Sequence, residues 1–514
     1  MRPFVLSLDT DATDPVSGPT FLRIARALAR DIQRGRLRAS EPLPGSRSLA
    51  QMLGVHRNTV LAAYRELAAE GWIETEETRG TFVSAAIPVV APRRFAGQPS
   101  APLAVAPRPA YDLPDHRATP HGSSLAPGTM TLGGGVPDVR LVPEAELARA
   151  MRRVLRRSAV PILSYGDPEG PRVLRSALAR MASGARGVVA SEDDVLVTRG
   201  SQMGIDLVAR GLLSPGDVVA VEALGYRPAW DALRASGARL VPIPVDGRGL
   251  DVDALARLCD ESEGRVRGVY VTPHHQLPTT VTLAPSRRLR LLELARARRM
   301  FILEDDYDHE FHYEGRPVLP LASADRHGSV IYLGTLSKVL APGLRIGFLV
   351  GPAPLVAHLA SIRKIVDRQG DQLLEHAVAE LLDEGAIQRH VRRAKRVYAE
   401  RRARLGALLE RAFDGVLSFE LPSGGTAIWA RVVDREVSAD AWADAARARG
   451  LVLQNARGFA FDGKSRPFLR LGFAQHDERE VKEAIGRMTS ALASLSVRAR
   501  GRTSRASLAS RSSP

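Results

Sequence analysis

The sequence predicts an α/β protein of two modules, a small helical one followed by a large domain with a mostly parallel sheet and flanking helices. Three observations support this prediction. Helical patterns and two short strand patterns fill residues 15–84. Short β-branched runs alternate with amphipathic helical patterns over residues 129–495, which is typical of parallel strands joined by helices. The length of 514 residues also exceeds what one core of ordinary size accommodates.

Two further segments complete the predicted organisation. Residues 85–128 contain nine prolines and little periodicity, and proline at this density favours extended, unpaired backbone. We therefore expect a semi-rigid linker there. Residues 496–514 are rich in Arg and Ser and poor in apolar residues, so we expect a disordered basic tail.

Composition limits the class and the compartment of the protein. The formal net charge of +15 favours a polyanionic partner, but only five of the 72 basic residues are Lys, and such an excess of Arg often reflects genomic base composition. No apolar run approaches the roughly 18 residues that a membrane helix needs, and Pro15 and several acids interrupt the N-terminus. We therefore expect neither a membrane span nor a signal peptide. The single cysteine, Cys259, fits a reducing compartment, and we expect a cytoplasmic protein.

The first module contains three helices and a hairpin. The first helix, FLRIARALARDIQRGRL, ends at Gly35 and places apolar residues on one face, namely Leu22, Ala25, Leu28, Ala29 and Ile32. Ser46 is expected to cap the second helix, SRSLAQML, which ends at Gly54. The third helix, RNTVLAAYRELAAE, ends at Gly71, and the strands WIET and GTFV follow. This order predicts a winged helix-turn-helix.

In a winged helix-turn-helix, the N-terminal end of the third helix enters the major groove of DNA. The side chains expected there are His56, Arg57, Asn58 and Thr59. Arg pairs with guanine edges and Asn with adenine edges. Arg47, early in the second helix, is placed for a phosphate or base contact. Arg79 and Gly80 at the tip of the wing would meet the minor groove or the backbone.

The segment SEPLPGSRSLAQMLGVHRNTVLAAYRELAAEGWIETEETRGTFV resembles the GntR-type DNA-binding domain nearly from end to end. The stretch LPGSRSLA, the helix start RNTV and the closing GTFV occur in the same register as in that family. The resemblance implies that the protein binds double-stranded operator DNA.

The large domain carries residues that suit pyridoxal phosphate (PLP). This cofactor needs a lysine for its aldehyde, a carboxylate for its ring nitrogen, an aromatic neighbour for its ring, and a helix start with hydroxyls and an Arg for its phosphate. The sequence offers a helix start at Gly200, Ser201 and Gln202, and Tyr226 after a strand. Asp305 and Tyr307 follow the strand MFILED, and Thr335, Ser337, Lys338 and Arg345 follow the strand SVIYLGT.

Each of these features has a simpler interpretation on its own. The helix start at Gly200 is also what an ordinary helix cap looks like, and a lone lysine is usually solvated. The acids of EDDYDHE also suit a metal site, but a strand-end aspartate explains them equally well and no second ligand cluster is apparent. The adjacent His274 and His275 are expected to point differently, so we interpret them as pocket lining and predict no metal site.

The ordered segments YGDPEG, TRGSQMGIDLVARGLLSPGD, EALGYRPAW, LEDDYDHEF, YLGTLSKVLAPGLRIGFLV and FLRLGFA resemble the fold-type I aminotransferases. By this resemblance Lys338 forms the Schiff base with PLP, Asp305 pairs with the pyridine nitrogen, Tyr307 with the ring oxygen, and Tyr226 stacks on the ring. The resemblance assigns the phosphate to Gly200, Ser201, Gln202, Thr335, Ser337 and Arg345. Arg470 matches the arginine that binds a substrate carboxylate. Tyr165 matches a tyrosine that reaches the phosphate of the neighbouring subunit.

The two modules together resemble the MocR subfamily of GntR regulators. This resemblance implies a head-to-tail homodimer that binds PLP and responds to a small amine, an amino acid or PLP itself. Two positions depart from the pattern, because Leu277 and Thr280 stand where aminotransferases carry Asn and Gly. Leu277 cannot donate to the ring oxygen, which would leave Tyr307 alone in that role.

Three functions remain open at this point. The first is a ligand-responsive transcription regulator that is not an enzyme, with at most a slow aminotransferase half-reaction at Lys338. The second is a true amino-acid aminotransferase with a DNA-binding extension. In the third, the cofactor is purely structural. The sequence does not identify the effector, the operator, or activation versus repression.

Overall fold

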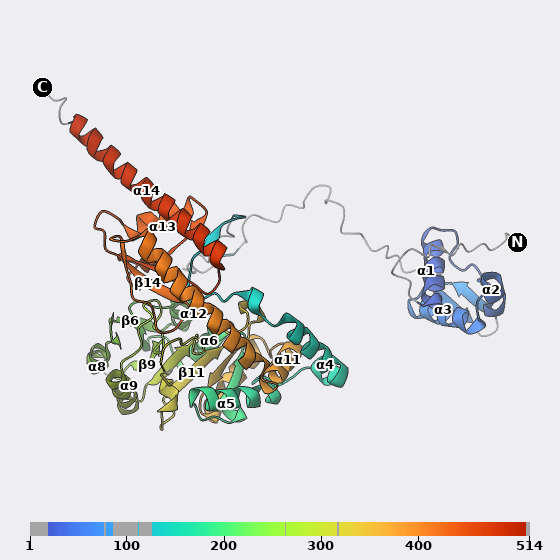
Figure 1. The fold of residues 1–514 in the computed structure, drawn as a ribbon. Helices are drawn as coiled ribbons and strands as arrows, with labels where there is room; N and C mark the ends of the chain where they lie inside the picture. The colour runs from blue at the N-terminus through green and yellow to red at the C-terminus, as the bar shows by residue number, and fades with distance from the viewer. Residues whose placement is uncertain are drawn as a thin grey trace. The chain divides into compact units, whose positions relative to one another are not determined.

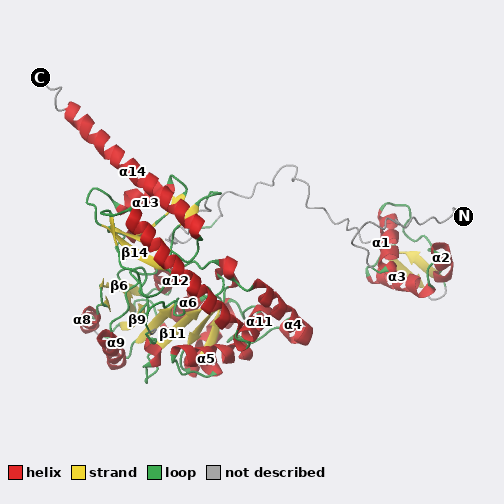
Figure 2. Ribbon diagram, in the orientation of Figure 1, coloured by secondary structure: helices red, strands yellow, loops and turns green. Residues whose placement is uncertain are grey.

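The computed structural model describes residues 19–76, 79–85, 111–112, 126–262, 264–315 and 318–509, without the side chains of residues 496–509. The chain divides into two units, Met1–Asp115 and His116–Pro514, which are described separately (Figures 1 and 2). Most of the predicted linker lies outside the described residues. No helix in the described part of the chain is both long and apolar enough to cross a membrane.

The first unit is the predicted winged helix-turn-helix. Its helices and strands are α1 (Thr20–Gln33), α2 (Ser46–Leu53), α3 (Arg57–Ala69), β1 (Ile73–Glu76) and β2 (Gly80–Val83). The two strands form an antiparallel hairpin in which Ile73 lies opposite Val83. One apolar cluster holds the helices and the hairpin together, with Ile24, Leu28, Leu49, Val60, Leu67, Trp72 and Ile73 among its buried members.

The start of α2 differs from the prediction. Gly45 occupies the cap position, and no side chain caps the helix. Ser46 is instead the first helical residue, and its Oγ accepts a hydrogen bond from Arg57 Nε at 3.3 Å. Ser46 already has a helical backbone and so does not serve as the predicted cap, and its hydroxyl instead contacts the next helix.

The second unit is built on a seven-stranded sheet with the order β4-β12-β11-β10-β9-β5-β6. Its strands are β4 (Val195–Thr198), β5 (Val218–Glu222), β6 (Arg239–Ile243), β9 (Val266–Val271), β10 (Phe301–Asp306), β11 (Val330–Thr335) and β12 (Gly347–Val350). Only β12 runs antiparallel to its neighbours, β11 and β4. The sheet is thus mostly parallel, as predicted, and its strands other than the edge strand β6 are largely buried, which is why they read as continuous apolar runs.

Helices cover both faces of this sheet (Figure 2). One apolar cluster packs α6 (Ser201–Leu212), α7 (Arg227–Ala235) and α10 (Ala353–Val366) on one face. Two others hold helices on the opposite face, namely α4 (Glu144–Ile162), α5 (Arg172–Arg186), α8 (Val252–Glu261), α9 (Pro285–Arg298) and α11 (Gln372–Asp383). Because side chains alternate along a strand, consecutive residues of β10 face different helix layers.

A smaller antiparallel sheet follows, with the order β13-β14-β17-β16. Its strands are β13 (Leu417–Ser418), β14 (Ala427–Val432), β16 (Gln454–Asn455) and β17 (Phe468–Gly472). It packs with α12 (Ala386–Ala412), α13 (Ala439–Arg447) and α14 (Glu478–Ala509). Short pairs are formed by β3 (Met130–Thr131) with β15 (Leu451–Val452) and by β7 (Val245–Asp246) with β8 (Gly249–Leu250). Single 3₁₀ turns are η1 (Val139–Leu141), η2 (Glu192–Asp194), η3 (Leu321–Ser323), η4 (Pro342–Leu344) and η5 (Ala456–Gly458).

The C-terminal end differs from the predicted disordered tail. The backbone of α14 continues as a helix to Ala509, and residues 510–514 lie outside the described residues. A helix that is already packed extends without a new nucleation cost, and Ala, Arg and Leu favour that extension.

Candidate functional site

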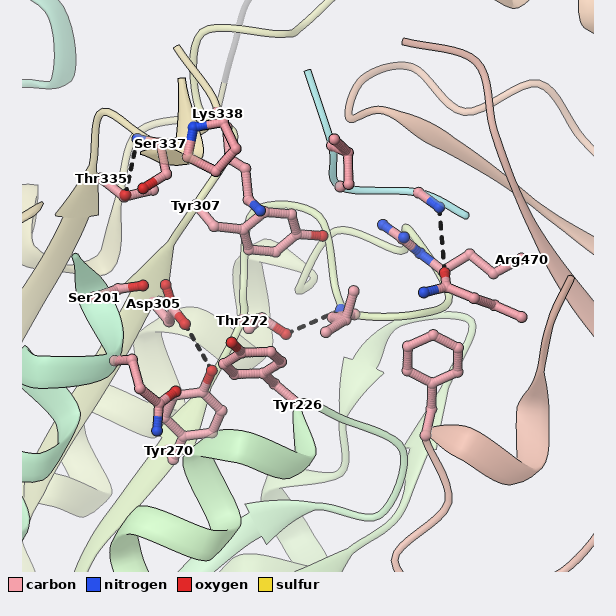
Figure 3. A pocket seen from close by; sticks show the side chains of 18 of the residues that line it. Ser201, Tyr226, Tyr270, Thr272, Asp305, Tyr307, Thr335, Ser337, Lys338 and Arg470 are labelled. Atoms are coloured by element: carbon pink, nitrogen blue, oxygen red, sulfur yellow. Dashed lines mark hydrogen bonds between the residues drawn. The ribbon is translucent and has the colours of Figure 1, made fainter. Parts of the chain in front are cut away.

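A cavity of about 280 Å³ lies in the second unit, where β10 and β11 end and α6 begins (Figure 3). The structure brings most of the predicted cofactor and effector residues into its wall: Ser201, Gln202, Tyr226, Asp305, Tyr307, Thr335, Ser337, Lys338, Arg345 and Arg470. These residues come from segments up to 269 positions apart (470 − 201). Their convergence in one cavity makes it the candidate site.

Lys338 follows β11 and reaches into this cavity (Figure 3). Burial lowers the pKa of Lys338, and the nearby Arg470 lowers it further, while Asp305 opposes the shift. A lower pKa increases the fraction of neutral amine at neutral pH, and the neutral amine is the nucleophilic form.

Asp305 is the second-last residue of β10 and is buried. Its Oδ2 accepts a hydrogen bond from the Tyr270 hydroxyl at 2.7 Å, whereas its Oδ1 has no hydrogen-bond partner among the described residues. Burial raises the pKa of Asp305 to about 6, although the Tyr270 hydrogen bond and the charge of Lys338 lower it. The open Oδ1 is an acceptor that suits a protonated ring nitrogen.

Sequence reasoning missed Tyr270, Thr272, Gln454 and Phe459, which also line the cavity. Tyr270 lies in β9, where it reads as one more apolar residue of a buried strand. The register of β9 and β10 places Tyr270 beside Leu303, two residues before Asp305, so Tyr270 and Asp305 share a face. Only the pairing of the two strands reveals this contact.

The start of α6 forms one end of the cavity. Gly200 occupies the cap position with φ +79°, and a Cβ there would lie 2.7 Å from Arg345 Nη2. Only glycine therefore allows the guanidinium to approach this helix start so closely. Ser337 Oγ is buried and has no partner among the described residues, and Ser337 N donates to Thr335 Oγ1 at 3.1 Å. A helix start, an Arg and a free hydroxyl are the donors that a phosphate requires.

Leu277 lines the cavity, and its backbone N–H donates to Thr272 Oγ1 at 3.1 Å. Leu277 thus forms a hydrogen bond through its backbone N–H, whereas its side chain has no donor or acceptor to offer to a ligand in the cavity. Tyr226 also lines the wall and packs against the apolar cluster below α6 and α7. The Tyr307 hydroxyl donates to the backbone oxygen of His275 at 2.8 Å.

Arg470 lies in β17 and is 2% exposed, and its Nε has no partner among the described residues. A Cβ at Gly134 would lie only 2.0 Å from Arg470 Nη1, so glycine is required there. Gly134 N donates to Gln454 Oε1 at 3.2 Å, and Gly135 N donates to Thr426 Oγ1 at 3.0 Å. The segment with these glycines therefore closes the cavity directly over the guanidinium.

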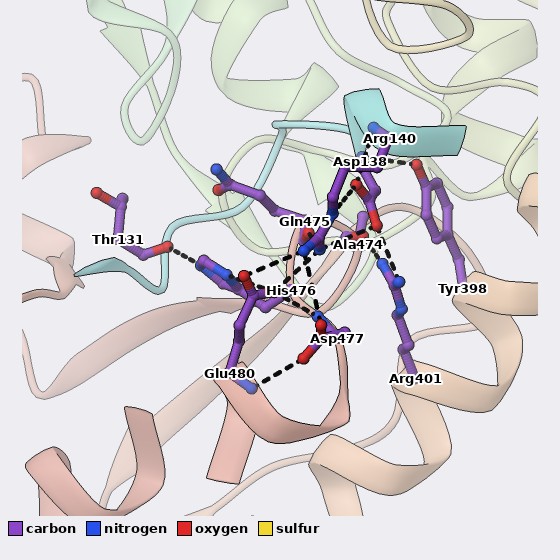
Figure 4. A network of polar contacts seen from close by, with 10 residues as sticks. All are labelled: Thr131, Asp138, Arg140, Tyr398, Arg401, Ala474, Gln475, His476, Asp477 and Glu480. Carbon is purple, nitrogen blue, oxygen red and sulfur yellow. Dashed lines mark hydrogen bonds and ion pairs between the residues drawn. The ribbon is translucent and has the colours of Figure 1, made fainter. Parts of the chain in front are cut away.

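A polar network anchors the end of this glycine segment (Figure 4). The Asp138 carboxylate pairs with Arg140 at 2.7 Å and with Arg401 at 2.9 Å, and Asp138 N donates to the Tyr398 hydroxyl at 2.9 Å. Burial raises the pKa of Asp138, but hydrogen bonds from Arg140 and Arg401 outweigh it, so the pKa lies below its ordinary value. Arg140 also pairs with Glu480 of α14 at 2.9 Å.

Tyr165 does not line the cavity within this chain. Its side chain is largely exposed, and the guanidinium of Arg368 lies over its ring at 4.5 Å. The exposed apolar residues Val160 and Leu163 shortly precede Tyr165 in the sequence. The exposed Ile365 shortly precedes Arg368.

The interpretation of His274 and His275 as pocket lining is wrong, because neither belongs to the cavity wall. Both are buried, and their ring centroids lie 4.4 Å apart, so the adjacent histidines do share one environment. The reason is that residues 272–277 turn after β9 and do not continue as an extended strand. Burial lowers the pKa of His274 to about 3.

In the first unit, the predicted DNA-contacting residues Arg47, Arg57, Asn58, Arg79 and Gly80 are exposed. Some of these predicted residues also have structural contacts. His56 caps α3, because its Nδ1 accepts from Asn58 N at 3.2 Å, and Thr59 is half-buried. Arg79 pairs with Glu76 at 3.2 Å and lies over the Phe82 ring.

Comparison with known proteins identifies a family for each unit. The family described as "Aminotransferase class I and II" matches residues 127–488, and "Bacterial regulatory proteins, gntR family" matches residues 20–83. The second unit resembles LysN, an alpha-aminoadipate aminotransferase from Thermus thermophilus. The TM-score is 0.65 and the identity 30%, over 72% of this chain and 94% of that one.

Two regulators are similar over nearly their whole length. The chain is 32% identical to the probable rhizopine catabolism regulatory protein MocR of Rhizobium meliloti, over 96% of this chain and 96% of that protein. It is also 32% identical to the HTH-type transcriptional regulator TauR of Rhodobacter capsulatus, over 91% of this chain and 96% of that protein. The chain therefore belongs to the aminotransferase class I and II family through its large domain and, as a whole, to the MocR-type transcription regulators of the gntR family.

Proposed function

We propose that the cavity binds PLP and that the protein uses it to sense a carboxylate-bearing primary amine. The observation that carries this proposal is the convergence, in one cavity, of a lysine of lowered pKa, a buried carboxylate with an open Oδ1, and a buried arginine with an open Nε. The LysN structure was solved in complex with N-(5'-phosphopyridoxyl)-L-leucine, which supports the cofactor class.

The residues of the cavity fit PLP part by part. When bound, PLP supplies an aldehyde that reacts with primary amines and a ring that withdraws electrons. Lys338 would hold the aldehyde carbon, Asp305 Oδ1 would accept the ring N–H, and Tyr226 would cover the ring face. The start of α6 with Arg345 and the hydroxyls of Ser201, Thr335 and Ser337 would hold the phosphate.

The effector would bind through Arg470. A carboxylate fits its guanidinium in a bidentate manner, and the surroundings are dry enough to make that pair strong. The amine of the same molecule would then lie toward Lys338, because a Cβ at Gly135 would lie 3.9 Å from both Arg470 Nη1 and Lys338 Nζ. PLP itself is the second possible effector, since it fills the same cavity.

Absorbance titrations with a panel of amines test this assignment. We expect an amino acid to shift the cofactor spectrum of the wild-type protein at a lower concentration than the same amine without its carboxyl group. Arg470→Met should weaken the binding of that amino acid by about 1.5–3 kcal/mol, which is a rise of its dissociation constant by about 10-fold to 150-fold, because a charge-assisted pair is lost. Arg431→Ala, an exposed arginine on the neighbouring strand β14, is the matched control.

Two other results would change the proposal. Equal affinities of the Arg470→Met and wild-type proteins would show that Arg470 does not bind the effector. A cofactor spectrum that no amine perturbs would instead favour sensing of PLP itself.

The exposed N-terminal end of α3 is proposed to bind operator DNA. Arg57→Ala should weaken operator binding by about 1–3 kcal/mol if Arg57 contacts a guanine edge. Fluorescence anisotropy at one fixed salt concentration measures this loss. Arg65→Ala, an exposed arginine on the same helix, serves as the control. An unchanged dissociation constant for Arg57→Ala would remove Arg57 from the interface.

We also propose a homodimer, which would be head-to-tail. The exposed Tyr165 and the exposed apolar residues Val160, Leu163 and Ile365 support this proposal, since a subunit interface would remove their side chains from water. In such a dimer Tyr165 would reach the phosphate end of the partner's cavity.

A further inference from the structure

Four histidines and two aspartates lie together behind the ends of β9 and β10. This histidine cluster consists of His274, His275, His309 and His312 with Asp306 and Asp308, and all six residues are buried. The ring of His274 is central, because its centroid lies 4.4 Å from that of His275, 4.8 Å from that of His309 and 6.1 Å from that of His312. None of the six residues lines the cofactor cavity.

Several nitrogens of the histidine cluster have no visible partner. Both ring nitrogens of His274 are buried without a hydrogen bond to any described residue, and so are Nδ1 of His309 and Nδ1 of His312. A buried polar group without a partner is costly, so native structures rarely leave one. One imidazole with two open nitrogens, beside two others with one each, indicates that a ligand belongs among them.

We propose that the histidine cluster binds one divalent transition-metal ion of the zinc class through His274, His275 and His312. One nitrogen from each of these residues lies within 4.8 Å of the others, so small side-chain rotations bring all three onto one ion. Three imidazoles select Zn²⁺, Ni²⁺ or Cu²⁺ over Mg²⁺ or Ca²⁺, which prefer oxygen.

His275 is already oriented for this role. Its Nδ1 lies 2.8 Å from Asp308 Oδ1, so the carboxylate accepts the ring N–H and leaves Nε2 as the open nitrogen. A carboxylate that orients a ligating histidine in this way is a recurrent feature of metal sites. Gly424 lies next to Nε2, where a Cβ would come within 2.2 Å, so a side chain at position 424 would collide with this nitrogen.

His309 and Asp306 form the competing ligand set with His274, within the same 4.8 Å. Asp306 Oδ2 lies 3.0 Å from His309 Nδ1 and accepts from the Tyr332 hydroxyl at 2.8 Å, while His309 Nδ1 and Asp306 Oδ1 have no hydrogen-bond partner among the described residues. The buried guanidinium of Arg186 also contacts the Tyr332 hydroxyl, and its positive charge would repel a cation at Asp306. The set with His275 and His312 is therefore favoured.

The proposed ion would lie close to the cofactor cavity without entering it. The backbone oxygen of His275 accepts from the Tyr307 hydroxyl, and Tyr307 lines the cavity. An ion held by His275 would thus fix the peptide that positions Tyr307.

Metal analysis of the full-length protein tests the proposal. The protein is purified without a polyhistidine tag, stripped with a chelator, and dialysed against Zn²⁺ before its metal content is measured. We expect one ion per chain in the wild-type protein and in His358→Ala, which removes an exposed histidine on α10. His312→Ala should lose the ion, and His309→Ala should keep it.

Two measurements keep the test independent of a folding defect. Zn²⁺ should raise the melting temperature of the wild-type protein but not that of His312→Asn, and circular dichroism checks that this variant folds. Co²⁺ should give intense visible d–d bands in the wild-type protein but not in His312→Asn, as expected for a four-coordinate site. A wild-type protein that binds no Zn²⁺ or Co²⁺ would overturn the proposal. Loss of the ion in His309→Ala but not in His312→Ala would overturn the assigned ligands.

Discussion

Lys338→Ala is expected to abolish the visible absorbance of the cofactor bound to lysine and, with it, the response of operator binding to amines. No other lysine can substitute, because only five are present in the chain and Lys338 alone lines the cavity. Absorbance spectra after addition of PLP measure the first loss. Operator affinity with and without the active amine measures the second.

Lys364→Ala is the matched control for this variant, since Lys364 lies exposed on α10. Its spectrum and its amine response should equal those of the wild-type protein. A Lys338→Ala protein that loses the absorbance but keeps the full amine response would show that the cofactor is purely structural. An unchanged spectrum would show that Lys338 is not the attachment point.

Glu310→Ala should destabilise the large unit more than any surface substitution. Glu310 is the acidic partner of Arg186, a guanidinium with no solvent exposure that also contacts the Tyr332 hydroxyl. Removal of the carboxylate breaks a buried ion pair, which costs about 3–5 kcal/mol, even though the carboxylate of Asp306 also acts on Arg186. Urea denaturation, followed by circular dichroism, should show a lower midpoint for the unfolding of this unit.

Glu314→Ala provides the comparison. Glu314 pairs with Arg402 but is itself 58% exposed, so its loss should cost about 0–1 kcal/mol. Equal destabilisation by the two variants would mean that water reaches Arg186 in solution. The difference between them therefore measures how dry the layer between α5 and the sheet is.

The sequence could predict the fold because its strongest signals are local. Buried parallel strands read as continuous β-branched runs, and Gly54 ends α2 in the left-handed conformation that glycine favours. The Ser46 cap was wrong because α2 begins one residue earlier than predicted, which places Ser46 inside the helix, where its hydroxyl accepts from Arg57, eleven residues away. A side chain with two possible partners is decided by tertiary contacts, which a local pattern does not contain.

The cofactor cavity was largely predictable, whereas its neighbours were not. Lys338 and Asp305 stand at strand ends, and parallel strand ends meet at one edge of a sheet. Tyr270 and the histidine cluster depend instead on the register of β9 against β10 and on the turn after β9. Residues that look unrelated along the chain, such as His274 and His312, become neighbours only after that turn is known.

The glycine segment over Arg470 has a consequence for signalling. Residues 134–136 form part of the cavity wall, and the same backbone leads N-terminally, through residues 85–128, to the winged helix-turn-helix. The C-terminal end of this segment is held in place by the ion pairs of Asp138 with Arg140 and Arg401. The connection to the DNA-binding unit therefore starts in the wall of the cavity, so a ligand that contacts residues 134–136 touches the same backbone that leads to that unit.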